Sequence, residues 1–214
     1  MAYRRTERES ARLAARCDAI IDAARALAIE SGLRAVQMAP VAERAGVAAG
    51  TVYRYFPSKE DLVAAMLSDT VEREIAAIRA AADGAPGTLS GLAAALMTFG
   101  AGALRTRRLT FAMLMEGPDG REANSTLRGS IGREFEGLIR AAIARGQLPE
   151  QPPAVMAAVI LGAMVEGLVG PLAPAPEGPD AERSAVQRTA LFALRALGIP
   201  DARARGLVLM ARRS

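Results

Sequence analysis

The chain of 214 residues contains no histidine, no tryptophan, a single cysteine and a single lysine. Without histidine, the catalytic triads that use an imidazole base and the usual zinc sites are excluded. A single cysteine excludes an internal disulfide, and no group of carboxylates has the spacing of metal ligands. We therefore expect no catalytic residue, no metal and no cofactor, and we predict that the protein is not an enzyme.

Aromatic residues are also scarce, at 4% of the chain, whereas 51% of the residues are hydrophobic and 23% are charged. Alanine, leucine and arginine dominate, and all three favour helices, while the β-branched and aromatic residues typical of strands are few. No alternation of polar and apolar residues holds for more than a few positions. The composition therefore predicts an all-α globular protein.

Positive charge is concentrated at one end. Residues 1–59 contain ten arginines and lysines against six acidic residues, whereas residues 60–214 contain seventeen of each. The whole net charge of +4 therefore lies in the first quarter of the chain. This favours an anionic partner for the N-terminal segment, either nucleic acid or a membrane surface, although a solubilising surface is an open alternative.

Two segments of the sequence bear on where in the cell the protein is found. The start, "MAYRRTERES", has no apolar core after its charges and so is not a secretory signal. The apolar stretch 154–173 is long enough to span a membrane, but it contains Glu166, three glycines and Pro171. We therefore predict a cytoplasmic protein with no membrane span.

The first predicted helix covers residues 11–31, with Gly32 as its C-terminal cap. Its apolar residues recur at helical spacing and form one stripe. That stripe contains Leu13, Cys17, Ile20, Ile21, Ala24, Leu27 and Ala28. The position of Cys17 in the stripe predicts a packed thiol rather than a reactive one.

Two short helices follow, near 39–45 and 49–55. Pro40 suits the first turn of the former, where its missing N–H is harmless. Gly46 can adopt the left-handed conformation that a tight turn requires. Two short helices joined by such a turn form a helix-turn-helix pattern.

The remaining chain is divided by Pro- and Gly-rich breaks. Pro57 ends the second short helix, and Ser58 with Asp61 resembles a capping box that opens a helix reaching about residue 82. We predict further helices near 88–105, 107–116, 119–145, 153–170 and 180–197, and either a short helix or a frayed end at 201–212.

The segments "AGV" (45–47) and "GTVYRYFPSK" (50–59), followed by Leu62, resemble the DNA-binding segment of the tetracycline-repressor (TetR) family, and the similarity extends over about residues 13–67. The resemblance implies an N-terminal three-helix DNA-binding domain with a helix-turn-helix, residues 1–57. It also implies a C-terminal helical domain, residues 58–214, that dimerises and binds a small effector.

The resemblance assigns DNA contacts to Gln37, Ala49, Gly50, Thr51, Tyr53, Arg54, Tyr55 and Lys59. Tyr53 and Tyr55 are about 200° apart around a helix, so either they reach phosphates on different strands or one of them packs. Lys59, at the first turn of the next helix, is expected to bind phosphate. Arg54 can bind either a guanine edge or a phosphate.

The sequence departs from the family pattern at three positions. Ala48 and Ala49 stand where the recognition helix usually starts with Ser and Lys, and the missing cap costs about 1 kcal/mol of helix stability. Gln37 stands in place of a usual Thr. We therefore expect affinity to depend more on N-terminal arginines, in an arm that either follows DNA or is disordered. The candidates are Arg4, Arg5, Arg8 and Arg12.

For the effector we expect an apolar pocket, and the candidates on the middle helices are Met97, Phe99, Phe111, Met113, Met115 and Phe135. The same residues would equally form plain core. Glu166 is either a pocket carboxylate, a salt-bridge partner across the dimer, or exposed. We expect a homodimer formed by the helices near 153–170 and 180–197 as an intermolecular four-helix bundle.

The predicted function is a transcriptional regulator, most simply a repressor that binds a palindromic double-stranded DNA operator as a homodimer. A small hydrophobic effector, aromatic or fatty, would release it. Activation instead of repression remains open. The competing hypotheses are an enzyme with a helical pocket and a non-specific DNA-organising protein.

Overall fold

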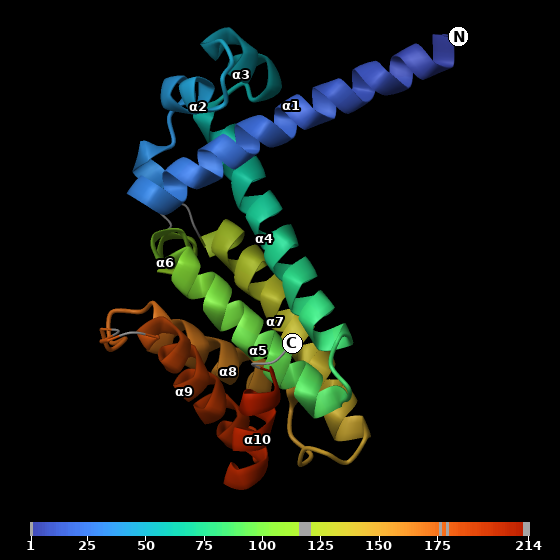
Figure 1. The fold of residues 1–214 in the computed structure, drawn as a ribbon, viewed down its shortest axis with the longest axis vertical. Coiled ribbons are helices and arrows are strands. Elements are labelled where there is room, and N and C mark those ends of the chain that lie inside the picture. The colour runs from blue at the N-terminus through green and yellow to red at the C-terminus, as the bar shows by residue number, and fades with distance from the viewer. Residues whose placement is uncertain (1, 116–120, 176, 179, 212–214) are drawn as a thin grey trace. The chain divides into compact units, whose positions relative to one another are not determined.

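The computed structural model describes the backbone of residues 2–115, 121–175, 177, 178 and 180–211, and the side chains of these except 2–10, 112–115 and 121–128. Every regular element in this part of the chain is helical, as predicted (Figure 1). The elements are α1 (Ala2–Ser31), the 3₁₀ turn η1 (Leu33–Ala35), α2 (Met38–Arg44), α3 (Ala49–Tyr55), α4 (Lys59–Asp83), α5 (Thr88–Arg105), α6 (Arg107–Met115), α7 (Arg121–Ala144), α8 (Pro153–Leu168), α9 (Ala181–Ala196) and α10 (Asp201–Ala211).

The predicted helices are confirmed with one clear shift. Helix α1 begins at Ala2 rather than near residue 11, so positions 2–10 form helix and not a disordered arm. The segment after Pro200 forms the helix α10, so of the two alternatives predicted for residues 201–212, the short helix is correct for 201–211. The predicted helix positions 116, 119, 120 and 212 lie outside the described residues.

The chain divides into two compact units, Met1–Thr70 and Val71–Ser214, and α4 contributes to both. The functional division at residue 57 therefore remains a prediction. Within the described residues no helix is both long and apolar enough to cross a membrane.

The core of the first unit joins all four of its helices. Ile20 of α1, Val41 of α2, Val52 of α3 and Leu62 of α4 are completely buried. Leu13, in contrast, is exposed, so the stripe predicted for α1 extends too far toward the N-terminus. The reason is that the N-terminal half of α1 extends beyond α2 and α3 and has no helix to pack on (Figure 1).

Cys17 lies at the edge of this core and is half-buried. Partial burial raises the pKa of its thiol, and the neighbouring carboxylate of Asp18 raises it further. A raised pKa leaves less of the reactive thiolate, which agrees with a structural role for this residue.

The core of the second unit is built around α5, most of which is buried, and which contacts α7, α8, α9 and α10. Gly100 permits the close crossing of three helices. A β-carbon there would lie 2.8 Å from Val186 Cγ1 of α9 and 2.9 Å from Met164 Cε of α8. A side chain at this position would therefore require the neighbouring side chains to shift.

Candidate nucleic-acid interface

The turn between α2 and α3 fixes the angle of the helix-turn-helix. Gly46 has a φ of 66° and donates its N–H to Glu43 O at 3.1 Å, while Val47 N–H donates to Ala42 O at 3.0 Å. This pair of bonds is a Schellman motif, which satisfies the last carbonyls of α2. Gly46 therefore reverses the chain where the sequence predicted it.

Helix α3 has one buried and one open face. Val52 is completely buried and anchors the helix, whereas Ala49, Gly50, Tyr53 and Arg54 are exposed. A β-carbon at Gly50 would meet nothing within 4 Å. The absence of a side chain there lets a partner approach the backbone of α3 closely.

The start of α3 is as weakly capped as the sequence predicted. Ala48 has extended backbone angles of −68° and 145°, and it makes no side-chain cap bond. Gln37 caps α2 equally poorly, because its side-chain amide donates to Arg34 O at 3.1 Å instead of to the helix. Gln37 is exposed, and Thr51 is half-buried within the first turn of α3.

The two tyrosines take opposite environments. Tyr53 is 54% exposed. Tyr55 is half-buried, and its hydroxyl oxygen is buried without a hydrogen-bond partner in the described part of the chain. The guanidinium of Arg54 lies 5.7 Å from the centre of the Tyr55 ring, a cation–π distance. Of the two alternatives drawn from their spacing, the structure therefore favours the one in which Tyr55 packs.

The capping box predicted at the start of α4 is confirmed. Asp61 N–H donates to Ser58 Oγ at 3.1 Å, and Ser58 donates to the Asp61 carboxylate through its N–H at 3.1 Å and its hydroxyl at 2.7 Å. Lys59 follows at the first helical position and is half-buried. The box fixes the helix end that carries this single lysine.

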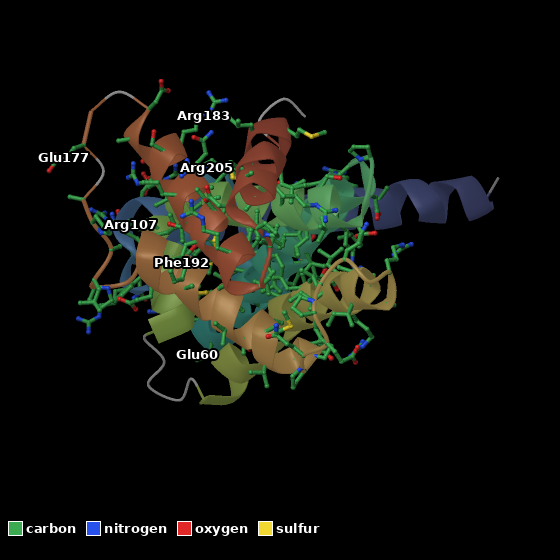
Figure 2. The ribbon with its side chains drawn as sticks, turned by 90° about the horizontal axis from the view of Figure 1, so that it is seen from below. Glu60, Arg107, Glu177, Arg183, Phe192 and Arg205 are labelled. Carbon is green, nitrogen blue, oxygen red and sulfur yellow. The ribbon has the colours of Figure 1, made fainter. Side chains whose placement is uncertain are left out.

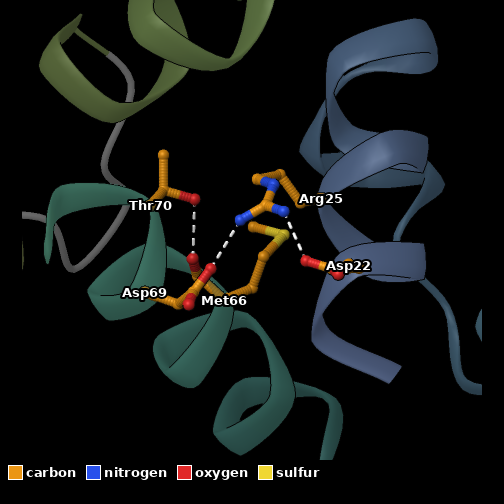
Figure 3. A network of polar contacts seen from close by, with 5 residues as sticks. All are labelled: Asp22, Arg25, Met66, Asp69 and Thr70. Atoms are coloured by element: carbon orange, nitrogen blue, oxygen red, sulfur yellow. Dashed lines mark hydrogen bonds and ion pairs between the residues drawn. The ribbon is translucent and has the colours of Figure 1, made fainter. Parts of the chain in front are cut away.

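Two ion-pair groups support this unit, and sequence patterns did not reveal either. Arg25 of α1 binds Asp69 of α4 at 2.5 Å and also pairs with Asp22 (Figure 3). Arg44 of α2 binds the Glu30 carboxylate of α1 through two guanidinium nitrogens. The hydrogen bonds from Arg44 lower the pKa of Glu30. Arg25 and Asp69 are 44 residues apart and Arg44 and Glu30 are 14 apart, so no helical spacing points to these two pairs.

The residues predicted for an effector pocket do not form one group. Phe99 and Phe135 are buried and meet edge to face at a ring distance of 5.9 Å, within the core of the second unit. Met97 is half-buried against that core, and Phe111 is half-buried. The side chains of Met113 and Met115 lie outside the described residues.

Glu166 lies elsewhere. Met164 and Leu168 of α8 face Gly100 of α5, and Glu166 is on another side of the helix. Its Oε1 accepts the N–H of Leu172 at 3.0 Å, and a β-carbon at Gly170 would lie 2.5 Å from its carboxyl carbon. The carboxylate thus holds the turn that follows α8, a role that the sequence did not indicate.

Glu166 also lines an open groove of about 410 Å³ between α8 and α9. The lining includes Gly167, Arg188 and Phe192. Phe192 is 60% exposed and projects from α9 (Figure 2). Val155 and Val159 of α8 are also exposed, at 59% and 56%.

Glu74 of α4 has a buried carboxylate that the sequence analysis did not identify. Its side chain rests on Gly102 of α5, where a β-carbon would lie 2.6 Å from Oε1. That oxygen is buried and has no hydrogen-bond partner among the described residues. Burial raises the pKa of Glu74, and the positive charge of Arg105 offsets part of the rise. Among the described residues there is no group of three or more possible metal ligands.

These features agree with a comparison with known proteins. A family model described as "Bacterial regulatory proteins, tetR family" matches residues 20–66, which run from the end of α1 into α4. Over this segment the chain is similar to the TetR family. The HTH-type transcriptional repressor KstR of Rhodococcus jostii (strain RHA1) is 57% identical over 54 residues, 25% of this chain and 26% of that protein. The chain thus matches about a quarter of the length of its curated relatives.

Solved structures share the fold over most of the chain. RolR in complex with resorcinol has a TM-score of 0.64 at 20% identity and covers 93% of this chain and 95% of that one. FadR from Bacillus subtilis in complex with stearoyl-CoA has a TM-score of 0.63 at 19% identity and covers 84% and 95%. The family model that matches residues 20–66 describes regulatory proteins, and the absence of enzymatic activity stays a prediction.

Proposed function

We propose that the protein is a ligand-responsive transcriptional repressor that binds a palindromic operator as a homodimer and is released by a small hydrophobic effector. The observation that carries this proposal is the open face of α3, which presents Gly50, Tyr53 and Arg54 while Val52 anchors the helix. A helix anchored in this way can enter the major groove with its backbone close to the DNA.

The roles we propose within this face follow from exposure and chemistry. Tyr53 would donate its hydroxyl to a phosphate, and Lys59 would add charge at the N-terminus of α4. Arg54 would read a guanine edge, because it is the exposed arginine of α3. Gln37, Ala49 and Thr51 would lie along the same DNA surface.

The surface of α8 and α9 supports the homodimer. Val155 and Val159 are exposed on α8 and lie four residues apart, and Ala163 continues the same face into the groove beside Phe192. We infer that the occupant is a second copy of the chain. The groove carries Glu166 and Arg188, so a two-fold axis would bring opposite charges together from the two copies.

An apolar effector fits the second unit. Among the described residues, the fully buried side chains there are hydrophobic, and Glu74, whose Oε1 is buried, is half-buried as a residue. The two fold relatives were solved with resorcinol, an aromatic molecule, and with stearoyl-CoA, which carries a fatty acyl chain. A largely hydrophobic effector, aromatic or fatty, is therefore our proposal, and a protein that acts on chromosomal DNA would work in the cytoplasm.

The decisive test selects binding sites from randomised duplex DNA with purified full-length protein at physiological salt. We expect one palindrome with half-sites about one helical turn apart, ~34–36 Å. Equal, weak binding to all sequences would point instead to a non-specific DNA-binding protein. No binding by a folded dimer would reject the proposal.

A further inference from the structure

The N-terminal half of α1 is helical from Ala2 onward. Among the α1 side chains that the structure describes, which begin at Ala11, Ile20 is the first that is fully buried, and Arg12 and Leu13 are exposed. Figure 1 shows this half extending beyond α2 and α3 within the first unit. Residues 11–15 are all exposed, so apolar packing does not explain the composition of this described stretch.

That composition is basic, and helical register gathers the charge on one side. At about 100° per residue, positions 4, 5, 8, 12 and 16 all fall within a sector of about 120°. The five residues at these positions are Arg4, Arg5, Arg8, Arg12 and Arg16. Glu9 falls at the border of the sector and Glu7 falls well outside it. From the first to the last, the row is about 18 Å long.

We propose that this arginine row is a second DNA-binding surface, which holds backbone phosphates of the DNA that flanks the segment contacted by α3. The inference rests on the proposed function. A row of cations on a rigid helix suits the regular phosphate spacing of a duplex and binds without first ordering an arm. It also compensates for the uncharged Ala48 and Ala49 at the start of α3.

DNA is favoured over a lipid surface because the row has no apolar counterpart. Helices that lie in a membrane interface pair a basic face with a broad hydrophobic face. Between Ala2 and Arg16, Leu13 is the one aliphatic residue larger than alanine, and Tyr3 is the one aromatic residue. Such a helix could attract anionic lipid but could not insert.

The test compares full-length wild type with Arg4→Gln/Arg8→Gln on two duplexes. One covers only the selected palindrome, and the other is longer by about one helical turn at each end. Each lost phosphate contact should reduce the slope of log K against log [salt] by about 0.9, so the double variant should lose about 1.8 per bound chain on the long duplex. On the short duplex it should match wild type.

Three controls make the result specific. Arg4→Lys/Arg8→Lys keeps the charge and should retain most of the wild-type slope. Arg183→Gln/Arg203→Gln removes the same charge from exposed positions of α9 and α10 and should bind both duplexes like wild type. Helical content and melting temperature should be equal in all variants, so that a change in binding does not reflect a change in folding.

The outcomes separate this inference from the proposed function. If wild type binds its palindrome and Arg4→Gln/Arg8→Gln has the wild-type slope on both duplexes, the arginine row is not a DNA contact. If that variant instead loses binding to phosphatidylglycerol vesicles while its DNA binding is unchanged, the row serves a membrane surface and the proposal is overturned. If wild type binds no DNA at all, both proposals fail.

Discussion

Arg25 and Asp69 join α1 to α4 through a part-buried ion pair of 2.5 Å, with exposed side-chain fractions of 19% and 25%. Arg25 also pairs with Asp22 (Figure 3). A single guanidinium thus serves two carboxylates from two helices. Because α4 begins at Lys59 and α1 supports α2, this contact helps to hold the proposed DNA-binding residues in one frame.

Arg25→Ala should therefore destabilise the first unit. Removing a charged donor from the part-buried carboxylate of Asp69 and the exposed carboxylate of Asp22 should lower the free energy of unfolding by about 1–3 kcal/mol. Arg140→Ala, which removes an exposed partner of Glu136 four residues away, should cost only about 0.3–0.5 kcal/mol. Urea unfolding followed by circular dichroism compares the two, and equal losses would show that the α1–α4 contact has no special role.

Tyr53→Phe and Tyr55→Phe form a matched pair in which each variant loses one hydroxyl. Tyr53→Phe should weaken operator binding about tenfold, because a hydrogen bond to a charged phosphate is lost. Tyr55→Phe should leave binding unchanged and stability equal or higher, because its hydroxyl is buried without a partner in the described residues. Fluorescence anisotropy with the selected operator measures both affinities. A larger loss for Tyr55→Phe would reverse the roles that we propose.

Arg54→Ala and Lys59→Ala should change DNA binding in different ways: the first should alter sequence preference and the second should alter overall affinity. Loss of a guanine contact should relax preference at one position of each half-site, by about 1–3 kcal/mol. Loss of a phosphate contact should weaken all sequences alike and reduce the salt slope by about 0.9 per chain. Repeating the site selection with each variant separates the two effects. An unchanged binding profile for Arg54→Ala would move that residue to the backbone contacts.

Phe192→Glu should dissociate the proposed homodimer, because it places a charge in an apolar interface. Its matched control is Leu209→Glu on α10, since the native side chains are 60% and 57% exposed. Sedimentation velocity should show a monomer for the first variant and a dimer for wild type and the second. A dimer that survives Phe192→Glu would place the interface elsewhere.

Glu74→Gln should stabilise the protein at neutral pH. Burial raises the pKa of Glu74 in the folded state above its ordinary value of 4.5. The folded state therefore holds the proton to higher pH than the unfolded state, and stability falls as pH rises from 4.5 through the folded-state pKa. The variant cannot ionise, so it should melt higher than wild type at pH 7 and equally below pH 4.5.

The control for Glu74→Gln is Glu150→Gln, which removes the same charge from an exposed position. A melting temperature for Glu74→Gln that is no higher than wild type at pH 7 would contradict the prediction. It would mean that the positive charge of Arg105 outweighs the effect of burial.

The features that the sequence predicted best are those encoded within a few residues. Gly46 at the turn and Ser58 with Asp61 at the helix start interact with residues close to them in the chain. Their structural roles can therefore be predicted from the local sequence. Apolar periodicity located the packed helices but placed the start of α1 too late. A helix segment without a core partner leaves no such periodicity.

Contacts between residues far apart in the chain could not be predicted from the sequence. The residues next to Glu74 in the sequence do not indicate that its side chain packs on Gly102. The contact between Phe99 and Phe135 is equally invisible in the sequence, because both contacts depend on how the helices pack. The effector candidates were chosen by residue type, and residue type does not distinguish core from cavity lining. Glu166 shows the same limit, since its partner is a backbone N–H in the following turn.

Helix α4 runs for 25 residues without a proline or an interior glycine. A helix of this composition bends little, because it contains none of the usual sites for a kink. Lys59 and Glu74 are about 22 Å apart along its axis. Under the proposed function, a tilt imposed on α4 near Glu74 would be carried along the helix to Lys59, because the segment between them has no site for a kink.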